Sequence, residues 1–188
     1  MEMKEQILTS AQRLVQQRGF NGFSYADIAA EVGIRKASLH HHFATKTDLA
    51  LALIEGYSAA LNTELARISA LPVQVDEKLR AYMAIYHGTL EVDRVCMGGM
   101  LASEALTLDA SLLPGLQRFF AINTDWLAKV LTEGSSQQIF ALNDKAESHA
   151  QLFLSALQGA LMIARATGQR DAFEQTCELL ISNLMRKG

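Results

Sequence analysis

Several residue types that mark other classes of protein are scarce in this chain. Its 188 residues include two cysteines, Cys96 and Cys177, and two prolines, Pro72 and Pro114. Two cysteines are too few for a disulfide framework. Charged residues interrupt every apolar run before it reaches the length of a membrane span, and the charged N-terminus has no apolar signal core. We therefore expect a cytoplasmic protein with no membrane partner.

Signatures of catalysis are also missing. The sequence has no paired carboxylates at a recognisable spacing, no phosphate-binding loop, no nucleophile elbow and no HExxH motif. We expect no enzymatic activity, no cofactor and no metal site. The net charge of −3 is uneven, because residues 1–50 carry six basic and five acidic side chains and the remainder carries eleven and fifteen. This mild asymmetry decides nothing by itself.

Helical periodicity is what the chain has in abundance. Hydrophobic residues make up 49% of it, and few segments alternate with period two, so the pattern predicts an all-α protein of about nine helices. The predicted helices cover residues 4–18, a segment capped by Ser24 that ends near Gly33, 35–42, 47–70, 75–91, a shorter irregular stretch that starts in CMGGMLASEAL, 112–133, 144–167 and 171–186. Gly134-Ser135-Ser136 is predicted to be a loop.

Residues 25–43 have the spacing of a helix-turn-helix. Ala29 is small where two helices must cross, Gly33 tolerates the positive φ of a tight turn, and Leu39 is apolar where the helices share a core. With the first helix as a third wall, these residues predict a three-helix DNA-binding head.

The outer side of the third helix then carries the candidate DNA contacts. If Leu39 and Phe43 point inward, the opposite face is small and polar, as the major groove requires. The predicted DNA-binding set also includes residues near the expected path of the phosphates and at the start of the second helix. The full set is Ser24, Tyr25, Arg35, Lys36, Ala37, Ser38, His40, His41, His42 and Lys46.

Three consecutive histidines, His40 to His42, require a separate interpretation. Successive helical side chains point about 100° apart, which is poor geometry for one metal ion. A general base would need a nucleophile and a pocket, and the head offers neither. Packing against Phe43 is an alternative for His42. Contact with DNA is our interpretation of the group.

Residues 11–49, AQRLVQQRGFNGFSYADIAAEVGIRKASLHHHFATKTDL, resemble the TetR family of transcriptional regulators. The resemblance rests on RGF at the end of the first helix, IA-x-x-x-G, and SL-x-H-x-F-x-x-K-x-x-L, and it covers about residues 7–51. It implies a DNA-binding domain over residues 1–46 and a ligand-binding and dimerisation domain over residues 47–188.

The resemblance also assigns roles to single positions. In the family, the position of His40 is usually a tyrosine bonded to phosphate, and that of Lys46 commonly contacts phosphate through the first turn of the next helix. His40 departs from this pattern. Because an imidazole is shorter than a phenol, we expect a contact that is weaker, or pH-dependent near the reference pKa of about 6.5.

The resemblance further implies an effector cavity in the central helices and a subunit interface in the last two. The candidate effector residues are Tyr57, Leu61, Tyr82, Met83, Tyr86, His87, Met97, Met100, Phe119 and Trp126. The candidate dimer residues are Phe153, Leu157, Ala160, Leu161, Ala164, Phe173, Cys177, Leu180 and Leu184. Cys96, beside two glycines, is a candidate redox site, with simple burial as the alternative.

The predicted function is a homodimeric transcriptional regulator. Its partners would be a palindromic double-stranded DNA operator, a second copy of the chain and a small, largely apolar effector that releases a repressor from DNA. Three alternatives stay open: an activator, a thiol-based redox or electrophile sensor acting through Cys96, and a helical interaction module that has lost DNA binding.

Overall fold

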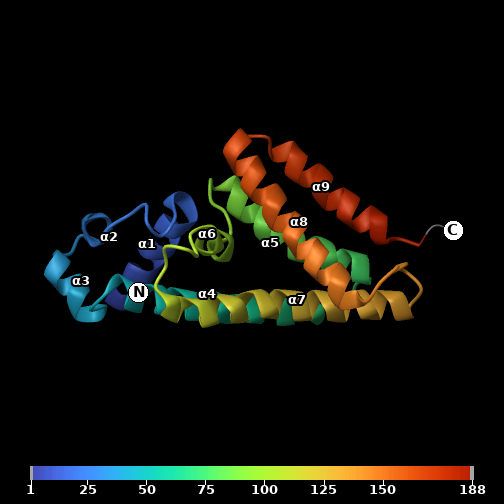
Figure 1. Ribbon diagram of the computed structural model, residues 1–188, viewed down its shortest axis with the longest axis horizontal. Helices are drawn as coiled ribbons and strands as arrows, with labels where there is room; N and C mark the ends of the chain where they lie inside the picture. Colours follow the sequence, from blue (N-terminus) through green and yellow to red (C-terminus); the bar gives the residue numbers. More distant parts are fainter. Residues whose placement is uncertain (1, 187–188) are drawn as a thin grey trace. The chain divides into compact units, whose positions relative to one another are not determined.

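The computed structural model describes residues 2–186 and places nine α-helices and one 3-10 helix in that range. Its elements follow the chain in this order (Figure 1): α1 (Met3–Arg18), α2 (Tyr25–Val32), α3 (Lys36–His42), α4 (Lys46–Ser69), α5 (Val75–Glu91), α6 (Met97–Ser103), η1 (Ala110–Leu112), α7 (Leu113–Ser136), α8 (Ala146–Thr167) and α9 (Arg170–Leu184). The only extended pairing described is one isolated antiparallel bridge between Phe140 and Met185. The all-α prediction is confirmed.

The helices form two compact units. The first comprises Met1–Ala60 and Cys96–Phe119, and the second comprises Leu61–Val95 and Phe120–Gly188. Helices α4 and α7 contribute residues to both units. The predicted boundary after residue 46 separates a DNA-binding domain from a ligand-binding and dimerisation domain. It concerns function rather than compactness, and it stays a prediction.

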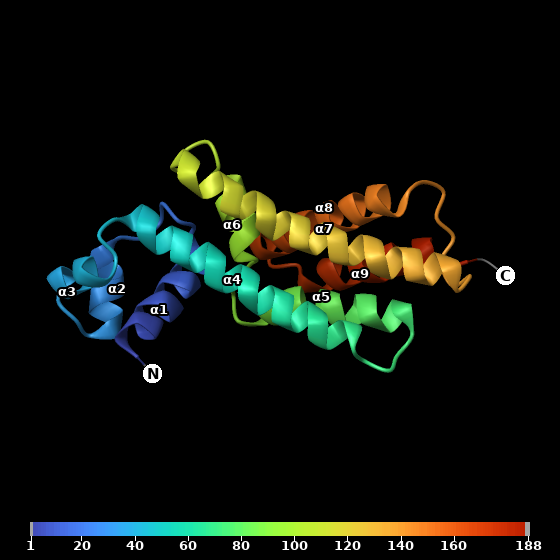
Figure 2. The ribbon, with the colours of Figure 1, turned by 90° about the horizontal axis from the view of Figure 1, so that it is seen from below.

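In the first unit, α1, α2 and α3 gather beside the first turns of α4 (Figure 2). Their apolar side chains form one core, and its fully buried members include Ile7, Leu14, Ile28, Leu39 and Leu49. Burying an aliphatic side chain contributes roughly 1.5–3 kcal/mol. A helix as short as α3, with seven residues, therefore depends on this packing rather than on its own propensity.

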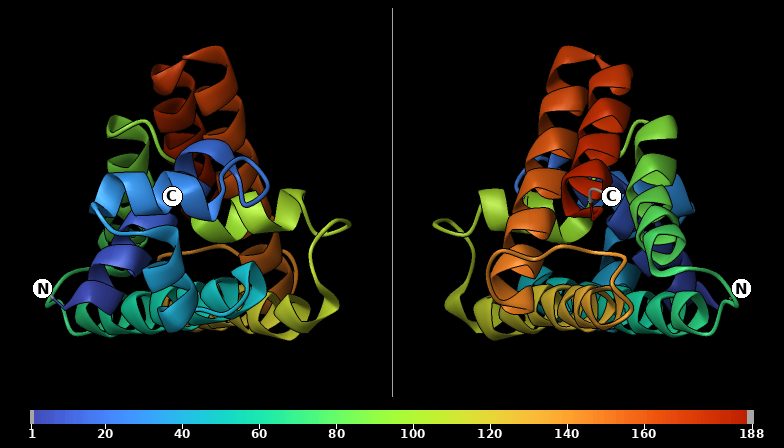
Figure 3. Two further views of the ribbon diagram at one scale, coloured as in Figure 1. Left: turned by 90° about the vertical axis from the view of Figure 1, so that its left-hand side faces the viewer. Right: turned by 90° about the vertical axis from the view of Figure 1, so that its right-hand side faces the viewer.

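In the second unit, α8 and α9 lie side by side and both contact α5 (Figures 1 and 3). Gly168 ends α8 in the left-handed conformation, with φ 73° and ψ 5°, and this allows the chain to reverse into α9. The core between these helices includes the fully buried Leu79, Tyr82, Leu157 and Phe173.

The structure corrects the predicted loop at residues 134–136. These residues are the last turn of α7, which continues to Ser136. Gly134 is required for space rather than for a turn, because a Cβ there would lie 2.2 Å from Cδ2 of Phe140. The chain leaves the helix at Gln137 instead. The other predicted helix boundaries agree with the structure to within about three residues.

Among the described residues, no helix combines the length and the apolar composition that crossing a membrane would require.

Candidate nucleic-acid interface

The turn between α2 and α3 has the geometry that the sequence predicts. Ser24 and Asp27 form a capping box at the start of α2, in which the Ser24 N–H donates to Asp27 Oδ2 at 2.7 Å. The hydrogen bonds that Asp27 accepts from the Ser24 hydroxyl and from the Ser24 backbone N–H lower the pKa of Asp27. Gly33 ends α2 with φ 76° and ψ 32°, a conformation that costs glycine little and other residues more. Its backbone N–H donates to the Ala29 carbonyl at 3.0 Å.

Helix α3 is anchored through its inner face and open on its outer face. Leu39 is fully buried, Phe43 is nearly so, and Ala29 of α2 is buried beside them. The opposite side of the helix and its N-terminal flank are exposed, as the prediction requires, at Arg35, Lys36, Ala37, Ser38, His40, His41 and His42. The structure therefore presents the predicted recognition residues together on one short exposed element.

The three histidines differ in their contacts. The ring of His40 lies 4.8 Å from the ring of Tyr25, and its Nδ1 is 3.1 Å from the Ala44 carbonyl oxygen. Because a carbonyl only accepts hydrogen bonds, Nδ1 carries the proton and Nε2 is the nitrogen left for an outside partner. The rings of His41 and His42 meet edge to face, 6.0 Å apart. His42 is exposed rather than buried against Phe43.

Tyr25 has an internal role in the structure. Its side chain is buried, and its hydroxyl lies 3.0 Å from the Phe43 carbonyl oxygen and 2.6 Å from that of Thr45. Burial, assisted by the charge of Asp48, raises the pKa of Tyr25 to about 12. The hydroxyl thus secures the segment between α3 and α4, so a DNA contact by this side chain would compete with its internal bonds.

Lys46 is also engaged within the chain. Its ammonium group donates to the carbonyls of Phe20 and Phe23 and lies 4.5 Å and 4.2 Å from the centres of their rings. Burial lowers the pKa of Lys46, and the negative charges of Glu104 and Asp27 oppose that shift. A phosphate contact through the backbone of the first turn of α4 would not disturb these bonds.

The predicted effector residues are divided between the two units. Tyr57, Met97, Met100 and Phe119 belong to the first unit, whereas Leu61, Tyr82, Met83, Tyr86, His87 and Trp126 belong to the second. In the first unit, the Tyr57 ring lies 5.4 Å from that of Phe119, and the Tyr57 hydroxyl is 3.9 Å from the sulfur of Cys96. Burial and the neighbouring Cys96 raise the pKa of Tyr57 well above its usual value.

A buried polar cluster occupies the second unit. The hydroxyls of Tyr82 and Tyr86 donate to the side-chain oxygen of Asn123 at 2.7 Å and 2.9 Å, and Asn123 is fully buried. The indole of Trp126 stacks on Tyr82 and donates to the Ser69 hydroxyl at 2.8 Å. The sequence reasoning missed Asn123, although one amide within an otherwise apolar helical stripe is a signal for such a cluster.

We expect Asn123→Ala to lower the free energy of unfolding by about 2 kcal/mol, because two buried hydroxyls lose their shared acceptor. Tyr86→Phe removes one hydroxyl and leaves the acceptor in place, so its expected cost is about 1 kcal/mol. Urea denaturation at equal protein concentrations measures both. Equal costs for the two variants would contradict the role of Asn123 as the shared acceptor.

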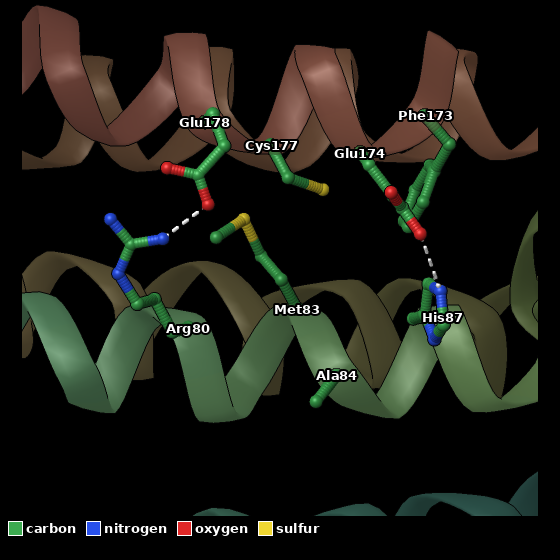
Figure 4. A pocket seen from close by; sticks show the side chains of 8 residues that line it. All are labelled: Arg80, Met83, Ala84, His87, Phe173, Glu174, Cys177 and Glu178. Carbon is green, nitrogen blue, oxygen red and sulfur yellow. Dashed lines mark hydrogen bonds and ion pairs between the residues drawn. The ribbon is translucent and has the colours of Figure 1, made fainter. Parts of the chain in front are cut away.

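A groove of about 290 Å³ lies between α5 and α9 (Figure 4). Its apolar lining includes Met83, Ala84, Phe173 and Cys177. An ion pair between Arg80 and Glu178 and a hydrogen bond between His87 and Glu174 connect the two helices across the groove. The groove thus includes two predicted effector residues, Met83 and His87. Burial, with the nearby Glu178 and Glu174, raises the pKa of Cys177 to about 11, so its thiol is a poor nucleophile.

Most of the predicted dimer residues are used inside the subunit. Seven of the nine are buried in the chain's own core: Phe153, Leu157, Leu161, Ala164, Phe173, Cys177 and Leu184. Side chains that are already covered offer little surface to a partner. The large apolar side chains on the outside of the pair are Leu152 and Ile163 on α8 and Leu179 on α9, each about 60% exposed.

Within the described residues, no group of three or more histidine, cysteine, aspartate or glutamate side chains is arranged to hold a metal ion.

Comparison with known proteins links this geometry to one group. Residues 7–53 match the family model described as bacterial regulatory proteins, tetR family. A crystal structure of a TetR-family transcriptional regulator from Agrobacterium tumefaciens is 32% identical, with 98% of each chain covered and a TM-score of 0.94. An uncharacterised HTH-type transcriptional regulator of Lactococcus lactis is 26% identical over 98% of this chain and 94% of its own. The negative transcriptional regulator IcaR of the Staphylococcus aureus biofilm operon icaADBC is 40% identical over 47 residues, a quarter of each chain.

Proposed function

Because the chain belongs to the TetR family of DNA-binding transcriptional regulators, we propose that it is a homodimeric repressor that binds a palindromic operator and is released by a small effector. IcaR, whose N-terminal region is similar to this one, is a negative regulator, and this similarity favours repression over activation for the present chain. A protein that binds an operator shares a compartment with the chromosome, so the cytoplasmic location belongs to this proposal.

One observation carries the DNA-binding part: α3 is fixed by buried Leu39 and leaves Lys36, Ser38 and His41 exposed. A recognition helix needs this combination, because base edges are read by side chains whose backbone is held rigidly. Lys36 can donate to guanine, Ser38 can bond several bases, and Ala37 is small enough to contact a thymine methyl group.

The dimer is proposed to form through the outer side of α8 and α9. Leu152 and Ile163 are eleven residues apart and therefore lie on the same side of α8, and Gly159 lies between them. A Cβ added at Gly159 would meet no atom within 4 Å, so this glycine leaves an open surface where a second helix can approach. Leu179 adds an exposed apolar side chain on α9. A two-fold axis would pair this surface with itself.

Release by an effector requires only that the ligand bind two conformations of the dimer with different affinities. The groove between α5 and α9 and the cluster around Asn123 are two places in the second unit where apolar surface adjoins polar groups that could orient a ligand.

The thiol-sensor alternative rests on Cys96, which is only 1% exposed and lies against the Tyr57 hydroxyl. This burial favours a packing role, because an oxidant would first need access to the sulfur.

Selection of duplexes from a random-sequence pool, followed by fluorescence anisotropy at several salt concentrations, tests the proposed function. We expect a dissociation constant of about 10⁻⁸ M or tighter for a selected palindrome, two subunits per site, and weak binding to a scrambled duplex. Weak binding that ignores sequence would contradict the proposal. The region upstream of the protein's own gene is a useful first probe.

A further inference from the structure

The loop between α1 and α2 is held by a side chain that lies far away in the sequence. Glu104, directly after α6, accepts a hydrogen bond from the backbone N–H of Phe20 at 2.6 Å and another from that of Asn21 at 3.2 Å. Each of its carboxylate oxygens takes one of these bonds. Such charge-assisted bonds to backbone N–H groups are among the stronger hydrogen bonds in proteins.

Neighbouring residues reinforce this contact. The side-chain amide of Asn21 donates to the Thr107 hydroxyl at 2.9 Å, and that hydroxyl in turn donates to the Glu104 carbonyl at 2.9 Å. Gly19, with φ +80°, leaves the space that the carboxylate uses, because a Cβ there would lie 2.7 Å from Glu104 Oε1. Glycine at this position therefore serves both the backbone conformation and the approach of Glu104.

The same loop is held from the other side by the start of α4. The carbonyls of Phe20 and Phe23 accept hydrogen bonds from Lys46, so the loop donates to an anion and accepts from a cation. Ser24, the cap of α2, is the next residue after Phe23. The position of this loop thus sets where α2 begins, and α2 packs directly on α3.

We propose that Glu104 is a positioning residue for DNA recognition: by holding the backbone of Phe20 and Asn21, it fixes α2 and α3 in the arrangement that reads the operator. The inference rests on the proposed DNA-binding function. It also gives the segment that follows α6 a direct influence on the head, in addition to the continuous helix α4.

Glu104→Gln tests the inference in the full-length protein, with the selected duplex and its scrambled version as probes. The amide keeps one acceptor and places a donor against a donating N–H. We expect about tenfold weaker binding to the selected duplex, unchanged binding to the scrambled duplex and an unchanged salt slope, since no phosphate contact is lost. Hydrogen exchange at the Phe20 and Asn21 amides should become at least tenfold faster.

Asp109→Asn is the matched control, because Asp109 lies in the same segment and bonds Ser111 rather than the head. It should leave operator affinity unchanged. Thr107→Ala removes the acceptor for the Asn21 side chain and should weaken binding to the selected duplex about threefold. This variant tests the role of the Glu104 segment if Glu104→Gln does not fold. The inference would be overturned if Glu104→Gln and Thr107→Ala both showed wild-type hydrogen exchange and wild-type operator affinity. So would an equal loss for both duplexes, which indicates less folded protein. If the wild-type protein itself does not bind selectively, the proposed function fails instead.

Discussion

An Ile163→Asp substitution is expected to convert the proposed dimer largely into monomers and to weaken operator binding at least a hundredfold. Ile163 is 61% exposed in the subunit and lies on the outer side of α8. A two-fold interface contains each residue twice, so the loss of its burial counts twice, at roughly 1.5–3 kcal/mol for each copy. An unpaired carboxylate in an apolar contact adds a further cost.

Light scattering at micromolar concentrations measures the oligomeric state, and circular dichroism checks that the helices remain. Leu106→Asp is the matched control, because Leu106 is fully exposed and lies outside α8 and α9. We expect that variant to stay dimeric. An Ile163→Asp protein that dimerises like the wild type would show that the partner does not use this face.

The DNA-binding head was predictable because its determinants are local. A capping residue at Ser24, a positive φ at Gly33 and an apolar anchor at Leu39 act within a few residues of one another, and the structure contains all three. Gly134 shows the limit of such reasoning. Its sequence context of glycine followed by two serines is typical of a loop, yet the residue lies in α7, where a Cβ would collide with the ring of Phe140.

Periodicity alone leaves open which side of α8 could face a second subunit. Helix α8 is apolar on two sides, and helical spacing does not tell which side faces the chain's own core. The predicted residues, such as Leu157 and Leu161, proved to be fully buried within the subunit. Gly159 lies on the outer side, where a Cβ would meet no atom within 4 Å, and the proposed interface uses this open surface.

Internal partners of polar side chains also lay beyond the sequence. Lys46 and Tyr25 were predicted to face DNA, and both bond backbone carbonyls of their own unit. Glu104 was not singled out at all, because its partners are more than eighty residues away. A carboxylate that bonds a distant loop leaves no local pattern, so only the fold could place it beside the head.

Reversing the charge of Lys36 provides the sharpest test of α3 as the recognition element. Lys36 is the first residue of α3 and is exposed, so Lys36→Glu changes the charge that meets DNA without disturbing the core. A specific contact contributes about 1–3 kcal/mol, and two subunits lose it together, so we expect operator affinity to fall by about thirtyfold or more. Anisotropy titrations with the selected and scrambled duplexes measure the loss, which should be larger for the selected duplex because Lys36 is proposed to contact a base. Lys129→Glu makes the same change of charge at an exposed position of α7 and should weaken binding only slightly. If the two variants lost affinity equally, net charge rather than α3 would account for the binding.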